Sequence, residues 1–182
     1  MRTPFVLWVT GLPASGKSSI TAAVVEQLQK RGVDPIVLES DTLRKYFTPH
    51  STYSEEERVL FYRGIVELAV KFVSHDVPVV IDATGNLRAY RQPARDQMAR
   101  FAEVFVDCPL EVCQSRDPKG IYRKALDGSA TTVPGAQAPY EPPIHPEVQI
   151  RSDREDPEGA ARKILDFLVM NGWIPQRRIQ RV

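Results

Sequence analysis

The residues with the clearest chemistry lie near the N-terminus, in the run Gly11-Leu-Pro-Ala-Ser-Gly16-Lys17-Ser18, which matches G-x-x-x-x-G-K-[ST] without a gap. Its glycines let the backbone curl so that successive N–H groups point inward and form a nest for anions. The positive end of a following helix adds to that field. Lys17 is then placed to reach the outer phosphates of a nucleotide, and the Ser18 hydroxyl to ligand Mg²⁺. We predict a site for ATP and Mg²⁺ formed by Gly11, Pro13, Ala14, Ser15, Gly16, Lys17, Ser18 and Ser19.

A second group of chemically capable residues begins with Glu39-Ser40-Asp41, at the end of a short apolar run. In an open parallel sheet, the carboxyl ends of the strands are where ligands bind. Asp41 is therefore placed to accept a hydroxyl proton or to join the magnesium shell, as phosphoryl transfer requires; the alternative is that it caps the next helix. Arg44 and Arg58 are candidate clamps for an acidic acceptor, although Arg58 also fits a solvated charge on a helix.

A third group follows another apolar run that ends at Asp82. Asp82 could contact magnesium through water, and a structural role fits it equally well. Arg88, Arg91 and Arg95 share one helical face at three- and four-residue spacing. For the last two arginines, a simple solvated face is an equally good interpretation.

Several classes of nucleotide-binding protein are disfavoured by missing motifs. A GTPase is expected to carry a guanine-reading N-K-x-D motif, and the sequence has none. No long Walker B run with a following glutamate is present either. A kinase fits better, because a carboxylate and arginine clamps follow the phosphate loop.

These groups are separated by alternating strand and helix patterns. Short apolar runs predict strands over residues 5–9, 35–39, 77–81 and 102–106, and helical periodicity covers 16–31, 54–74, 87–100 and 109–116. Ser54 and Glu57 have capping-box spacing, and Asp156-Pro157 predicts the start of a helix that runs to about Asn171. This alternation predicts an α/β fold with a doubly wound, mostly parallel, five-stranded sheet and helices on both faces.

The segment over residues 117–146 departs from this alternation because it is rich in proline and glycine. A stretch this long is either a functional lid or disordered. Basic residues at its start, among them Arg116 and Lys119, favour a lid that closes over phosphates. We predict one P-loop domain over residues 1–182, with an inserted lid at about 117–146.

Composition limits the partners. The 182 residues are enough for one well-buried domain, and a net charge of +1 gives no overall field that favours nucleic acid or a membrane. The residues before Gly11 are too few for a signal peptide. Cys108 and Cys113 are expected to be reduced and structural, in the cytoplasm.

Beyond these local features, the chain resembles adenosine 5′-phosphosulfate (APS) kinases, from about Val6 to Leu168. The resemblance is carried by the phosphate loop, Asp41 with Leu43-Arg44, Ser54 with Arg58, Arg88 with Arg91 and Ala94-Arg95, Glu103-Val-Phe-Val106 with Pro109-Leu-Glu111, Cys113-Gln-Ser-Arg-Asp-Pro-Lys-Gly-Ile-Tyr122 and Pro139-Tyr-Glu141. It implies ATP-dependent phosphorylation of the ribose 3′-hydroxyl of APS, with Asp41 near the reacting oxygen. It also implies Arg44 and Arg58 on the acceptor, and Arg116 and Lys119 in the lid.

The sequence departs from this family on the acceptor side. Glu39-Ser40-Asp41 stands where the family has D-G-D, Phe61 where it has asparagine, and Thr84-Gly-Asn-Leu-Arg88 where it has I-S-P-Y-R. Val133-Pro-Gly-Ala-Gln137 replaces F-T-G-I-D, whose phenylalanine stacks on the adenine of the acceptor. Phe61 or Tyr62 is a candidate substitute. The stretch Asp82–Asn86 is more similar to small kinases of the polynucleotide-kinase and toxin types.

Our interpretation is a kinase of the APS kinase type, with Lys17 and Asp41 as catalytic residues, Ser18 on the metal and Arg116 on the nucleotide. We predict that the acceptor, an acidic nucleotide, is bound by Asp41, Arg44, Arg58, Phe61, Gly85, Asn86, Lys119 and Tyr140. Two alternatives stay open, a kinase of another nucleotide or small hydroxylated metabolite, and a non-catalytic nucleotide-binding regulatory module. Dimers are usual in the family that the chain resembles, so a homodimer is one option and the oligomeric state stays open.

Overall fold

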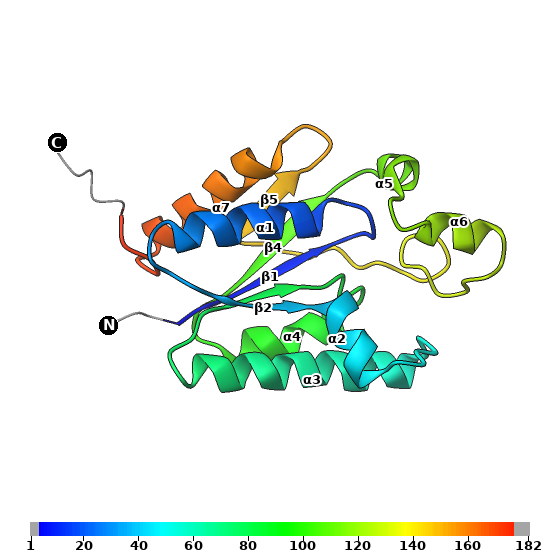
Figure 1. Ribbon diagram of the computed structural model, residues 1–182, viewed down its shortest axis with the longest axis horizontal. Helices are drawn as coiled ribbons and strands as arrows, with labels where there is room; N and C mark the ends of the chain where they lie inside the picture. Colours follow the sequence, from blue (N-terminus) through cyan, green and yellow to red (C-terminus); the bar gives the residue numbers. More distant parts are fainter. Residues whose placement is uncertain (1–3, 177–182) are drawn as a thin grey trace.

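The computed structural model describes residues 4–176, and its centre is a parallel sheet. The strand order is β2-β3-β1-β4-β5, and every pair of neighbours is parallel (Figure 1). The strands are β1 (Val6–Gly11), β2 (Ile36–Glu39), β3 (Val79–Asp82), β4 (Phe101–Asp107) and β5 (Val148–Arg151). The predicted five-stranded, doubly wound α/β architecture is therefore confirmed.

Helices cover both faces of this sheet. Figure 1 shows α1 and α7 on one face and α3 and α4 on the other, while α5 and α6 lie beyond the carboxyl ends of the strands. The helices are α1 (Lys17–Gln29), α2 (Ser40–Phe47), α3 (Glu55–Val73), α4 (Arg88–Gln97), α5 (Leu110–Arg116), α6 (Ile121–Leu126) and α7 (Pro157–Met170). None of the helices within residues 4–176 combines the length and the apolar character needed to cross a membrane.

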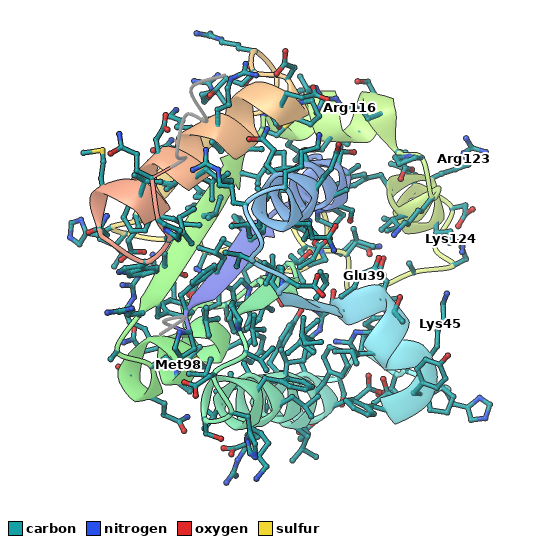
Figure 2. All side chains as sticks on the ribbon, turned by 60° about the vertical axis from the view of Figure 1, so that its left-hand side comes forward. Glu39, Lys45, Met98, Arg116, Arg123 and Lys124 are labelled. Atoms are coloured by element: carbon teal, nitrogen blue, oxygen red, sulfur yellow. The ribbon has the colours of Figure 1, made fainter. Side chains whose placement is uncertain are left out.

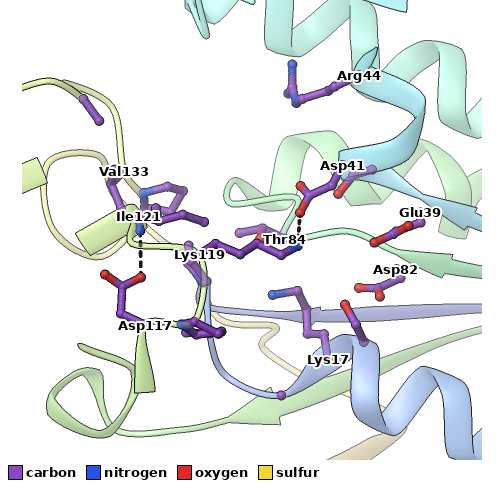
Figure 3. A pocket seen from close by; sticks show the side chains of 18 of the residues that line it. Lys17, Glu39, Asp41, Arg44, Asp82, Thr84, Asp117, Lys119, Ile121 and Val133 are labelled. Carbon is purple, nitrogen blue, oxygen red and sulfur yellow. Dashed lines mark hydrogen bonds and ion pairs between the residues drawn. The ribbon is translucent and has the colours of Figure 1, made fainter. Parts of the chain in front are cut away.

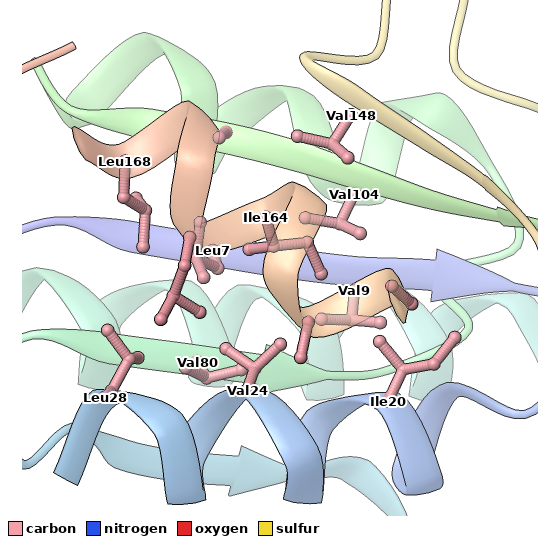
Figure 4. Packing of buried hydrophobic residues seen from close by; sticks show 14 of the residues in the cluster. Leu7, Val9, Ile20, Val24, Leu28, Val80, Val104, Val148, Ile164 and Leu168 are labelled. Carbon is pink, nitrogen blue, oxygen red and sulfur yellow. The ribbon is translucent and has the colours of Figure 1, made fainter. Parts of the chain in front are cut away.

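Strand β1 is buried along its whole length because it contributes to two cores. Leu7 and Val9 pack with α1 and α7, in the core drawn in Figure 4. Val6 and Trp8, which alternate with them, pack with α3 and α4 on the other face. Each fully buried side chain of this size contributes about 1.5–3 kcal/mol, so a continuous apolar run is what this central strand requires.

Two predicted helix starts are confirmed in detail. The Asp156 side chain accepts a hydrogen bond from the backbone N–H of Gly159 at 2.6 Å, with Pro157 in the first turn of α7. The Ser54 hydroxyl accepts one from the N–H of Glu57 at 3.2 Å. The Glu57 carboxylate does not return to Ser54; it accepts from the N–H of Thr52 at 2.6 Å, so only half of the capping box forms.

The solvated interpretation of the arginine face on α4 is wrong for Arg91. This residue is 1% exposed, and its guanidinium donates to the Glu103 carboxylate at 2.7 Å and to the Gly85 and Glu141 carbonyls. Arg95 also pairs with Glu103, at 3.0 Å, and with Glu147, at 2.6 Å. Glu103 lies on β4, and its carboxylate compensates the buried charge of Arg91. The spacing of residues along α4 could not reveal a partner on another element.

Three elements were not located by the sequence patterns. Helices α2 and α6 are only eight and six residues long, and β5 has four residues, of which Val148 and Ile150 are buried. The alternation of polar and apolar residues in β5 is a signal that was available. Helix α6 lies inside the segment rich in proline and glycine. A helix of six residues is too short to show a clear periodicity among so many turn-forming residues.

Because Arg91 is enclosed, Arg91→Ala should leave Glu103 buried with only one of its two arginine partners. We expect the free energy of unfolding in urea to fall by about 3–5 kcal/mol. Arg88→Ala on the same helix is the matched control, because the side chain of Arg88 is 46% exposed and its contact with Glu141 is 3.7 Å long; we expect a loss below about 1 kcal/mol. Equal losses in the two variants would contradict this account of the Arg91 network.

Candidate active site

A cavity of about 1090 Å³ opens at the carboxyl ends of the strands. Its walls come from the loop before α1, the ends of β2 and β3, the starts of α2 and α3, and the segment after α5 (Figure 3). This is the edge of an open parallel sheet at which ligands bind. The separate sequence groups therefore meet in one space, as predicted.

The loop between β1 and α1 has the geometry of an anion-binding turn. Gly16 has φ 97°, a conformation that favours glycine, and it immediately precedes α1. Gly11 sits so close to β4 that an added Cβ would lie 2.5 Å from the Val106 carbonyl oxygen. Both glycines of the motif are thus required by the backbone.

Lys17 is held by this loop. Its Nζ donates to the carbonyl oxygens of Gly11 at 3.1 Å and Leu12 at 2.8 Å. Burial lowers the pKa of the Lys17 ammonium, and the carboxylates of Asp82 and Asp41 oppose that shift. Carbonyl oxygens are neutral acceptors, and the charged oxygens of a phosphate form stronger hydrogen bonds with an ammonium. Exchange of the two carbonyls for phosphate oxygens is therefore favourable for Lys17.

Three carboxylates face the loop from the opposite wall. Glu39 ends β2, Asp82 ends β3, and Asp41 lies in the first turn of α2. Glu39, the residue before α2, occupies the N-cap position of that helix. Neither Glu39 nor Asp41 makes a side-chain hydrogen bond that caps α2. The capping interpretation of Asp41 is therefore not supported, and its side chain is free to point into the cavity (Figure 3).

Asp41 carries an ion pair to the lid segment. Lys119 Nζ lies 2.5 Å from Asp41 Oδ2, and both side chains are more than half exposed. The hydrogen bond to Asp41 raises the pKa of Lys119. The structure thus brings together the predicted catalytic carboxylate and the predicted lid cation, from positions 78 residues apart.

Arg44 lines the cavity but is already engaged on three sides. Its guanidinium lies over the rings of Phe61, at 3.9 Å, and Tyr53, at 4.8 Å, and it donates to Glu57 at 3.0 Å. Phe61, predicted to contact the acceptor, is 3% exposed and lies behind Arg44, outside the cavity wall. The neighbouring Tyr62 does line the wall.

Arg58 is buried and not solvated, with 8% of its surface exposed. It donates to the Tyr53 carbonyl at 3.0 Å, to Asn86 Oδ1 at 3.0 Å and to the Thr132 carbonyl at 2.8 Å. It therefore joins α3 to the loop after β3 and to the lid segment, while it also lines the cavity. Sequence patterns gave no indication of these partners.

Three further residues that were predicted to contact the acceptor lie outside the cavity lining. Asn86 donates to the Pro139 carbonyl at 3.0 Å, and the Gly85 N–H donates to the Tyr62 hydroxyl at 3.1 Å. The Tyr140 hydroxyl is 3.2 Å from Thr10 Oγ1. Gly85, Asn86 and Tyr140 are not part of the cavity lining, so their contact with an acceptor stays a prediction.

The segment over residues 117–146 packs on the phosphate loop. The Tyr122 hydroxyl donates to the Pro13 carbonyl at 3.0 Å, and Val133 joins a small core that includes Leu12 and the two free, buried cysteines. Arg116 and Lys124 line the cavity, and Figure 2 shows Arg123 and Lys124 on the same side of the molecule. The segment is thus positioned as a lid would be, and its movement stays a prediction.

The oxygen groups on the cavity wall fit a nucleotide-bound Mg²⁺. Ser18, Glu39, Asp41 and Asp82 all line it. Within residues 4–176, no cluster of three or more metal-ligating side chains is present. Mg²⁺ is usually held by one or two protein oxygens together with substrate phosphates and water, so the donor set suits an ion that arrives with the nucleotide.

Comparisons with known proteins decide the family. The model of the family described as adenylylsulphate kinase matches residues 3–151. The chain belongs to this family. Its members are ATP-dependent kinases, and the chain is therefore an ATP-dependent kinase with the P-loop fold.

Individual relatives agree with this. An adenylyl-sulfate kinase from Gloeothece citriformis is 36% identical over 168 residues, which cover 92% of this chain and 96% of that protein. A bifunctional enzyme CysN/CysC from Xylella fastidiosa is 39% identical over 173 residues, or 94% of this chain, but this chain spans only 28% of that protein. The structure of the Mycobacterium tuberculosis APS kinase CysC in complex with AMPPNP and APS is 32% identical, with a TM-score of 0.86 over 92% of this chain and 99% of that one.

The position of Lys17 leads to a direct test of the phosphate loop. Lys17→Ala removes the ammonium aimed at the phosphates, so we expect kcat/KM for ATP to fall by about 10²- to 10³-fold, with an unchanged thermal unfolding temperature. Lys30→Ala, at the other end of the same helix, is the control because the side chain of Lys30 is 65% exposed. Full ADP release by Lys17→Ala would rule out this role for the loop.

Proposed function

We propose that the chain transfers the γ-phosphoryl group of ATP to the ribose 3′-hydroxyl of APS. The observation that carries this proposal is that one cavity, in a member of the adenylylsulphate kinase family, joins Lys17 and Ser18 to Asp41 and Arg44. The first pair suits a nucleotide phosphate chain and the second an acidic acceptor with a hydroxyl group. The same juxtaposition argues against a regulatory module without activity.

The donor half of the reaction rests on the loop before α1. Its backbone N–H groups cradle the phosphates, and Lys17 leaves the Gly11 and Leu12 carbonyls to bind the outer ones. Ser18, with water and phosphate oxygens, would hold Mg²⁺, which neutralises charge on the β- and γ-phosphates when bound. Arg116 and Lys119 are placed to balance the charge that develops on the transferred group.

The acceptor half rests on Asp41. We propose that its carboxylate takes the proton of the 3′-hydroxyl while the 3′-oxygen forms a bond to the γ-phosphorus. The bond from that phosphorus to the bridging oxygen breaks, and ADP leaves. Lys119 pairs with Asp41 in this structure, so the entry of substrate must draw Lys119 toward the phosphoryl oxygens and leave the carboxylate free to act as a base.

One observation favours a different acceptor as the second candidate. Val133 is buried and lines the cavity where the family has the phenylalanine that stacks on adenine. A base–aromatic stack is worth about 1–3 kcal/mol in single-strand binders. Phe61 cannot replace it because it lies behind Arg44, which leaves Tyr62 and Tyr53 as the aromatic rings on the wall. Another nucleotide or a small hydroxylated metabolite is therefore the alternative acceptor.

Two further parts of the proposal concern the protein's surroundings. A cytoplasmic location is supported by Cys108 and Cys113, which are free and buried, because thiols stay reduced in that compartment. A homodimer rests on the family resemblance alone.

Acceptor identity is tested by ADP release with ATP, Mg²⁺ and APS, set against a panel of other nucleotides and small alcohols. We expect turnover with APS to exceed that with every other member of the panel. ADP release only with another acceptor would keep the phosphate-loop chemistry and replace APS as the substrate. Tight ATP binding without turnover of any acceptor would favour the regulatory module instead.

The role of Asp41 is tested by Asp41→Asn, which keeps the shape of the side chain and removes its basicity. We expect kcat to fall by about 10²- to 10⁴-fold, with the ATP dissociation constant within about threefold of the unchanged protein. Asp34→Asn is the control, since Asp34 is an exposed carboxylate whose partner is Gln29. Near-normal turnover by Asp41→Asn would place the base elsewhere.

A further inference from the structure

Three arginines are buried in the part of the chain that the structure describes, and two of them have a carboxylate partner. Arg44 pairs with Glu57 at 3.0 Å. Arg91 pairs with Glu103 at 2.7 Å. Arg58, which is 8% exposed, forms no ion pair with any of the described residues. A buried cation without a counter-ion costs stability. The fold tolerates that cost at the cavity wall, which Arg58 lines, and so keeps a full positive charge there.

Neutral oxygen atoms hold the Arg58 guanidinium instead. Nε donates to the Tyr53 carbonyl at 3.0 Å, and Nη1 donates to Asn86 Oδ1 at 3.0 Å. Nη2 donates to the carbonyl of Thr132 at 2.8 Å and to its hydroxyl at 3.2 Å. Bonds to all three nitrogens fix the plane of the guanidinium. Because none of these acceptors carries a charge, the positive charge of Arg58 stays available to an anionic ligand.

Asn86 is the side chain that makes this neutral arrangement possible. It is 3% exposed; its Oδ1 accepts from Arg58, and its Nδ2 donates to the Pro139 carbonyl at 3.0 Å. An arginine can only donate and a carbonyl can only accept, so the group between them must offer one acceptor and one donor. An amide does this, whereas an aspartate of the same shape would bring a negative charge to Arg58 and a second acceptor to Pro139. With both ends of its amide engaged, Asn86 acts on a ligand through Arg58.

We propose that Asn86 is a positioning residue for the anionic group of the acceptor. It holds the guanidinium of Arg58 at the wall and, as a neutral partner, leaves the charge of Arg58 to a phosphate or sulfate oxygen. The inference rests on the proposed function, because it requires an acidic acceptor. The family pattern I-S-P-Y-R has proline where Asn86 stands, so this use of an amide belongs to this chain and not to the family pattern.

The test measures ADP release with ATP, Mg²⁺ and APS in Asn86→Ala and Asn86→Asp. We expect KM for APS to rise by about 10-fold in Asn86→Ala, which loses one hydrogen bond to a charged group. In Asn86→Asp we expect a rise of about 100-fold, because the carboxylate would neutralise Arg58 and repel the acceptor. KM for ATP and kcat should stay within about threefold of the unchanged protein in both variants.

A merely structural amide predicts a different result. Asn86→Asp keeps the shape of the side chain and its bond to Arg58, so it would then be the milder of the two variants, and KM for both substrates would change together. Either outcome would overturn the proposal, as would an unchanged KM for APS in both variants. Asn171→Ala and Asn171→Asp are the matched controls, because the exposed Asn171 also donates to a carbonyl, that of Phe167 at 2.8 Å, and lies outside the cavity lining.

A double-mutant cycle tests whether Asn86 acts through Arg58. Arg58→Lys keeps the charge and removes the planar fork that Asn86 orients. We expect Asn86→Ala to raise KM for APS by less than about twofold further in the Arg58→Lys background, since residues that act as one unit are not additive. A further rise of about 10-fold in that background would show that the two residues act independently and would overturn the proposal.

Thermal unfolding shows whether the variants fold. If Asn86→Ala does not fold, Asn86→Asp alone decides, because a rise in KM for APS without a rise in KM for ATP is expected only if Arg58 is neutralised. If neither folds while the two Asn171 variants do, the role of Asn86 is structural and the proposal is wrong.

The acceptor panel separates this inference from the proposed function. If another acidic compound replaces APS as the acceptor, the same kinetics are measured with that compound, and the role of Asn86 is decided although APS has failed. If the protein phosphorylates uncharged alcohols alone, the kinase stands and the inference falls, because Arg58 then has no anion to bind. If no acceptor is turned over, both fall together.

Discussion

A cavity that must receive a polyphosphate has to hold several cationic side chains close together, in surroundings that penalise uncompensated charge. Here three of the cations that line the cavity are held by groups that a substrate can replace or adjoin. Lys17 rests on two carbonyls, Lys119 on Asp41, and Arg44 on Glu57 and two aromatic rings. Substrate binding is therefore an exchange of partners, and for the buried Lys17 and Arg44 the cost of desolvating the cation has already been met by the fold.

The same contacts explain how a segment rich in proline and glycine is held in place over the site. Its first part is fastened to the phosphate loop by Tyr122, and its later part to the acceptor side by Arg58 and Asn86. Lys119 lies in the first part and reaches across to Asp41. A segment that contacts both half-sites changes its contacts when either is filled, so donor and acceptor binding are expected to depend on each other.

The sequence predicted best what local spacing determines. The phosphate loop, the buried strand before it and the capped start of α7 each depend on residues within a few positions of one another, and each was found. Arg58 binds Asn86 and Thr132, which lie 28 and 74 residues away along the chain, and Arg91 binds Glu103, which lies 12 residues away on another element. No periodicity encodes such pairings. Phe61 was misplaced for a related reason: residue type suggested a stacking ring for the acceptor, whereas in the fold the ring is covered by Arg44.

Three departures from the family pattern lie on the acceptor side of the cavity or beneath its wall. Phe61 lies beneath Arg44, Asn86 binds Arg58, and Val133 lines the wall beside the lid. Phe61 and Asn86 thus contact the two arginines assigned to the acceptor, and Val133 follows Thr132, whose carbonyl accepts from Arg58. Lys17, Ser18 and the glycines of the phosphate loop keep the full motif. Stacking and an amide contact fix the orientation of an arginine without changing its charge. The acceptor site therefore keeps its attraction for an anion, and what these residues alter is the shape of the space around it, where the remainder of the acceptor must fit.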